Sequence, residues 1–165
     1  MNKQDIFNGL MTITREKYYA CEAEAASVDK NHPTERGALQ LKAGIYHAAI
    51  AAGLISGTDQ ATELMGKRFK NLIRQFPDIA DYYHALPEDQ KEIMEVSLYP
   101  EVFMRASFYK TYNTDLEQAE KDGDPVKIFK AKIKKEVLDE ILSMWRDFRV
   151  QNGLFVFAFN GKESL

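Results

Sequence analysis

The residue types that most often carry catalysis or bind metals are scarce in this chain. It has three histidines and one cysteine, and no Glu-x-x-His, Gly-x-Ser-x-Gly or Gly-x-Gly-x-x-Gly pattern. A di-iron bundle, a serine hydrolase and a dinucleotide-binding fold are therefore all disfavoured. We expect the histidines to have structural roles, and Cys21 to pack as a small apolar residue because it lies in an apolar stripe.

One acidic pattern allows a hypothesis about metal chemistry. Glu117 and Glu120 are three residues apart near the end of one expected helix, and Glu136 and Asp139 are three apart on the next. Four carboxylates on two facing helices are suited to holding Mg²⁺. This spacing, over about 25 residues, resembles the magnesium-binding arrangement of all-α nucleoside-triphosphate pyrophosphohydrolases of the MazG type. The resemblance implies a Mg²⁺-dependent hydrolase with these four residues as metal ligands. Leu116 departs from it, because the family usually has a further glutamate there.

A lysine-rich segment suggests a binding function instead. Lys127, Lys130 and Lys134 share a helical stripe that continues through Leu138, Ile141 and Trp145. A stripe that is half basic and half apolar suits an acidic partner with an apolar anchor. A face of lysines in solvent, paired with nearby acids, is the alternative. A second basic face, Lys67 to Arg74, would allow phosphate contacts with a nucleic acid.

These residues must be positioned by helices, because apolar side chains recur every three or four residues along most of the chain. We expect an all-α, single-domain bundle of six or seven helices over residues 1–153. Pro33 should occupy the first turn of the second helix, and Asp124-Pro125 should open the longest helix, which ends at Asn152-Gly153. Gly53–Gly57 and Tyr99-Pro100 are expected to interrupt helices.

The C-terminal residues 154–165 differ from the rest. Phe155, Phe157 and Phe159 alternate with aliphatic residues, which favours an extended segment with two apolar faces. Such a segment must dock, either on its own bundle or on a second copy or another protein.

Composition restricts the remaining possibilities. The chain has 165 residues, 22 Lys+Arg, 25 Asp+Glu and a net charge of −3, so the overall charge gives no sign of nucleic-acid or membrane binding. One cysteine excludes an internal disulfide, and no export signal is recognisable at the N-terminus, so we expect a cytoplasmic protein.

The favoured hypothesis is a non-enzymatic interaction or regulatory protein that needs no cofactor. It binds a protein, or itself as a homodimer, through the lysine and apolar helix face and the aromatic tail. The alternatives are the Mg²⁺-dependent hydrolase and a nucleic-acid-associated regulator.

Overall fold

The fold is all-α, as predicted, in a computed structural model that describes residues 1–157 and Phe159, with residues 59 and 61 described for their backbone only. No strand occurs among these residues. The elements are α1 (Lys3–Ser27), α2 (Pro33–Ser56), α3 (Asp59–Arg74), α4 (Pro77–Ala85), α5 (Glu88–Met104), the π-helical turn η1 (Arg105–Tyr109), α6 (Lys110–Asp122) and α7 (Pro125–Gln151).

The helices begin and end at residues suited to those positions. Asn2 caps α1, since its side chain accepts from the amide of Asp5 at 2.9 Å while the Asp5 carboxylate accepts from the Asn2 amide at 3.0 Å. Asp124 caps α7 by accepting from the amide of Val126 at 2.9 Å. Pro33 and Pro125 each stand in a first turn, as predicted.

One predicted interruption is wrong. Tyr99-Pro100 lies inside α5, which continues through η1 into α6 without a break. A proline inside a helix costs about 3 kcal/mol. Leu98, Tyr99 and Val102 on either side are buried, and each such side chain contributes about 1.5–3 kcal/mol. Packing therefore outweighs the lost hydrogen bond.

The interruption predicted over Gly53–Gly57 is confirmed, because α2 ends at Ser56 with Gly57 as its C-cap and α3 begins at Asp59. Gly53 itself lies in the last turn of α2. A Cβ on Gly53 would meet the side chain of Met11. The glycine thus serves the close approach of α1 and α2.

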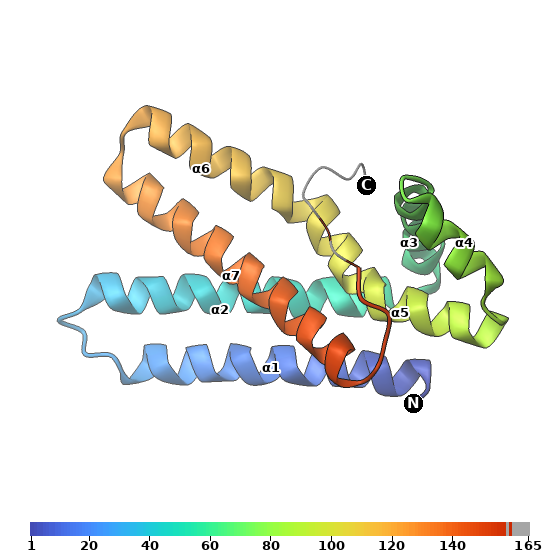
Figure 1. The fold of residues 1–165 in the computed structure, drawn as a ribbon. Coiled ribbons are helices and arrows are strands. Elements are labelled where there is room, and N and C mark those ends of the chain that lie inside the picture. Colours follow the sequence, from blue (N-terminus) through green and yellow to red (C-terminus); the bar gives the residue numbers. More distant parts are fainter. Residues whose placement is uncertain (158, 160–165) are drawn as a thin grey trace.

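The helices enclose two apolar clusters. Helices α1 and α2 form an antiparallel hairpin, α7 crosses over α2, and α3 and α4 lie at the opposite end from the α6–α7 turn (Figure 1). The main core lies between α1, α2, α5 and α7, and its buried members include Ile6, Leu10, Tyr46, Ala49, Val137, Ile141 and Trp145. A second cluster joins α3, α4 and α5 and includes Met65, Phe69, Leu72, Tyr83, Leu98 and Val102.

Helix α2 is long and apolar enough by composition to cross a membrane, with 39% of its most apolar window buried in the fold. Core helices of soluble proteins satisfy the same criterion. Here α2 packs on α1, α5 and α7.

Candidate functional site

A groove of about 750 Å³ runs between the N-terminal halves of α2 and α7. Its lining is mainly apolar, with lysines from α7. The lining residues are Pro33, Thr34, Gly37, Ala38, Leu41, Pro125, Val126, Phe129, Lys130 and Lys134. Val126 and Phe129 are 61% and 43% exposed, although both belong to the apolar line of α7.

The course of α7 explains this exposure. The helix passes obliquely over α2, and its first turns lie far from α1 (Figure 1). Ile133 and Val137, further along the same apolar line, are buried in the main core. The line therefore changes from core to surface between Ile133 and Phe129, and its exposed end forms one wall of the groove.

Three predicted partner-binding lysines lie on this part of α7. Lys130 and Lys134 line the groove, whereas Lys127 is placed beside it and pairs with Asp122, Nζ to Oδ2, at 3.7 Å. The Lys134 ammonium lies 5.9 Å from the centroid of the Tyr112 ring. Lys130 is exposed and makes no ion pair within the described part of the chain. The groove thus combines apolar surface with at least one unpaired positive charge.

Trp145 does not belong to this surface, which corrects the predicted stripe. Its side chain is 0% exposed, and its Nε1 donates to Thr14 Oγ1 at 2.9 Å. Leu138 and Ile141 are buried as well. The stripe is basic surface at its beginning and core at its end, because the second half of α7 lies in the main core.

The aromatic tail packs on its own chain. The Phe155 ring stacks on Tyr82 with centroids 5.4 Å apart. Phe157 is 3% exposed and meets Phe76 edge-on at 4.9 Å. Phe159 lies beneath the guanidinium of Arg105, whose Cζ is 4.2 Å from the ring centroid. Of the two predicted docking modes, the structure has the intramolecular one; residues 158 and 160–165 of the tail lie outside the described residues.

The four carboxylates of the magnesium hypothesis are not brought together. No three His, Cys, Asp or Glu side chains in the described ranges form a group that could hold a metal. The short turn at Gly123 explains this, because it makes α6 and α7 an antiparallel hairpin in which Lys134 faces Tyr112. Glu120 is therefore opposite the first turn of α7, whereas Glu136 lies about 16 Å further along that helix.

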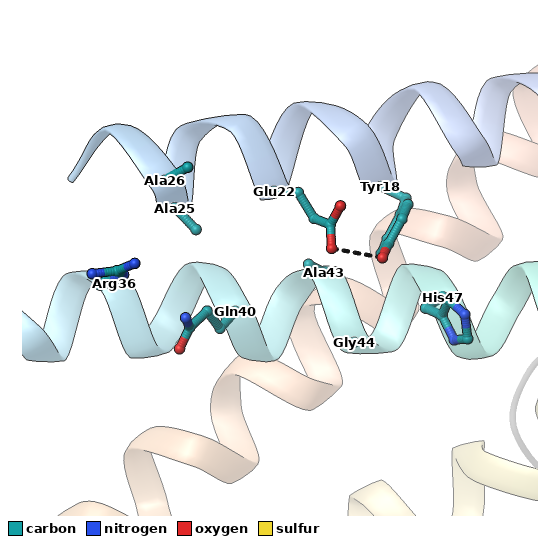
Figure 2. A pocket seen from close by; sticks show the side chains of 9 residues that line it. All are labelled: Tyr18, Glu22, Ala25, Ala26, Arg36, Gln40, Ala43, Gly44 and His47. Atoms are coloured by element: carbon teal, nitrogen blue, oxygen red, sulfur yellow. Dashed lines mark hydrogen bonds between the residues drawn. The ribbon is translucent and has the colours of Figure 1, made fainter.

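A second depression, of about 670 Å³, lies between α1 and α2. Tyr18 and Glu22 come from α1, and Arg36, Gln40 and His47 from α2 (Figure 2). The Tyr18 hydroxyl donates to Glu22 Oε1 at 2.6 Å, and this hydrogen bond raises the pKa of the phenol.

Sequence reasoning missed this α1–α2 groove. It assigned the histidines structural roles, whereas His32, His47 and His84 are all exposed and His47 lines this groove. The available signal was the spacing of polar residues on α2, where positions 36, 40 and 47 share a face. Cys21 is partly buried against the main core, as predicted.

Comparisons of the chain with protein-family models, with curated proteins and with solved structures found no match.

Proposed function

We propose that the chain is a non-enzymatic protein-interaction module, and that the groove between α2 and α7 receives an acidic, amphipathic helix of a partner protein. The exposed Phe129 ring beside Lys130 is the observation that carries this proposal. A large apolar side chain in a groove between two helices is costly in water, and covering it favours association.

The shape of the groove supports a helical occupant. Two helices form its walls, and Gly37 and Ala38 leave room for side chains of an incoming helix. Apolar residues at positions i, i+3 or i+4, and i+7 of that helix would contact Val126 and Phe129. Its acidic face would lie against Lys130 and Lys134, which makes charge complementarity the basis of selectivity.

Peptide binding tests the proposal. The probe is a fluorescently labelled amphipathic helix with leucines at i, i+3 and i+7 and glutamates beside them, and its control carries lysines in place of the glutamates. We expect the acidic peptide to bind and the basic peptide to fail. Phe129→Ser should weaken binding at least tenfold, since burial of a Phe side chain contributes about 1.5–3 kcal/mol.

A matched variant on the same helix distinguishes loss of this binding surface from a general effect of replacing an exposed apolar residue of α7. Val150 is 57% exposed at the opposite end of α7, so Val150→Ser should leave peptide binding unchanged. The combined Lys130→Glu and Lys134→Glu variant should lose the acidic peptide. Equal binding of both peptides, or equal effects of the Phe129 and Val150 variants, would contradict the proposal.

Two other occupants of the groove, a nucleic acid and a second copy of the chain, would give different results. A nucleic acid would depend on the lysines and not on Phe129, and its binding would weaken steeply with salt. A second copy of the chain would appear as a dimer in native mass spectrometry, and Phe129→Ser would dissociate it. Because the chain has one cysteine, we place the module in the reducing cytoplasm.

A further inference from the structure

We propose that the α1–α2 groove binds a small ligand that joins an oxyanion, either a carboxylate or a phosphate, to a planar ring. The oxyanion lies on Arg36, and the ring lies beside Tyr18 and His47 (Figure 2). This site is on a different face of α2 from the lysine groove, and it extends beyond the function proposed above.

Arg36 supplies the first argument. Its Nε is shielded from solvent and has no hydrogen-bond partner. The side chain forms no ion pair with any described residue, whereas Arg105 and Arg149 both pair with Glu101. A guanidinium presents a planar set of donors that matches a carboxylate or a phosphate. A ligand oxyanion would supply the hydrogen-bond acceptor that Arg36 Nε lacks among the described residues.

The opposite end of the groove is suited to a ring. The Tyr18 and His47 rings have centroids 5.6 Å apart and an interplanar angle of 53°. Both side chains extend from facing helices at the same end of the groove (Figure 2). An aromatic ligand placed here would gain contacts with two rings.

The middle of the groove is polar on one side and open on the other. Glu22 is oriented by the Tyr18 hydroxyl, which bonds only one of its carboxylate oxygens, so the other can accept an N–H of the ligand. At Gly44 a Cβ would meet nothing within 4 Å, so the floor leaves space.

The volume and length of the α1–α2 groove suit an elongated organic molecule. The volume of about 670 Å³ falls within the range of about 300–1,000 Å³ typical of small-molecule sites. Arg36 and His47 are eleven residues apart on α2, or about 16 Å along its axis. An inorganic ion alone cannot bridge that distance, whereas an organic ligand with an oxyanion at one end and a ring at the other can reach from the Arg36 side chain toward Tyr18 and His47.

Two probes distinguish the sources of the oxyanion. Adenosine 5′-monophosphate is the phosphate probe and indole-3-propionate the carboxylate probe; adenosine and indole-3-propionamide are their uncharged controls. In ¹H–¹⁵N spectra of the full chain, we expect at least one charged probe to shift the backbone amides of Ala25, Ala43 and Gly44 in a saturable way. Its uncharged control should bind at least tenfold more weakly, because it lacks the charge that Arg36 contacts.

Variants connect the binding to Arg36. Arg36→Gln should abolish the saturable shifts. Arg36→Lys should retain part of them, because lysine keeps the positive charge but lacks the planar set of guanidinium donors. Arg15→Gln removes an exposed arginine of α1 outside the groove and should change nothing. Because Arg36 has no ion-pair partner among the described residues and its Nε has no hydrogen-bond acceptor there, Arg36→Gln should also leave the melting temperature unchanged.

Three results would contradict the proposed site. The first is the absence of saturable shifts with both charged probes, and the second is equal binding of a probe by Arg36→Gln and by the unaltered chain. The third is a lower melting temperature of Arg36→Gln, because it would show that Arg36 has a structural role instead. Phe129→Ser should not alter probe binding, so failure here is distinguishable from failure of the proposed function.

Discussion

Arg149 and Glu101 form an ion pair inside the bundle, with Nη2 of the arginine 2.5 Å from Oε1 of the glutamate. The residues are 0% and 2% exposed. The second oxygen of Glu101 accepts from Arg105 Nε at 2.9 Å, and Arg149 also donates to the carbonyl of Ser97 at 3.4 Å. The cluster joins the end of α7 to the continuous helix α5–η1–α6. Through Arg105, which contacts Phe159, it also reaches the tail.

Removing the acid from this cluster should be strongly destabilising. Glu101→Leu leaves Arg149 as an unpaired buried charge, and such a loss costs about 3–5 kcal/mol of the free energy of unfolding. Urea denaturation followed by circular dichroism measures the change. The double variant Glu101→Leu with Arg149→Met should recover most of the loss, because an apolar pair of similar volume needs no partner.

The control for that series is Glu92, whose ion pair with Lys3 is exposed on both sides. Glu92→Gln should change the free energy of unfolding by less than about 1 kcal/mol. A double variant less stable than Glu101→Leu alone would contradict the prediction, because it would show that Arg149 stabilises the fold even without Glu101, through its packing and its bond to the Ser97 carbonyl.

The indole of Trp145 provides a second prediction, because its Nε1 has one acceptor, Thr14 Oγ1. Thr14→Val leaves a buried donor unpaired, and we expect a loss of about 1–3 kcal/mol. Thr12→Val, an exposed substitution on the same helix, is the matched control. Trp145 is the only tryptophan, so its emission reports unfolding directly; equal stability of the two variants would contradict the prediction.

Helix boundaries set by local chemistry were predictable from the sequence. Pro33 and Asp124-Pro125 act through groups one to three residues away, and both predictions are confirmed. The end of α2 predicted within Gly53–Gly57 is confirmed as well. Pro100 has an equally strong local signal, yet its buried neighbours keep it inside α5. Local signals fail where partners distant in sequence contribute more free energy.

The surfaces were harder to predict, since exposure depends on how helices cross. The spacing on α7 grouped Lys130 with Leu138, Ile141 and Trp145, which are buried, and it could not show that Phe129 is exposed beside Lys130. The α1–α2 groove depends on the register between two helices, which places Tyr18 beside His47. A single sequence does not specify that register.

Phe157 anchors the tail, and its replacement gives a third prediction. Phe157→Ala removes a ring that meets Phe76 and Phe159, so tail docking should weaken. We expect a loss of at most about 3–5 kcal/mol and faster protease cleavage after Gly153. Val156→Ala, at a half-buried neighbour, should have a smaller effect. Because the tail packs on its own chain, the oligomeric state should not change; a shift from dimer to monomer would contradict this.

Tyr83 and Tyr99 provide the last prediction, which concerns alkaline pH. Both hydroxyls donate to Glu95, and burial first, then this carboxylate, raises the pKa of each phenol above its usual range. The folded state therefore holds protons that the unfolded state releases, so the free energy of unfolding falls as pH rises above about 10. Absorbance at 295 nm should show these phenols ionising only with unfolding. Glu95→Gln should shift that transition to a different pH, and ionisation of every tyrosine in the folded chain near pH 10 would contradict the assignment.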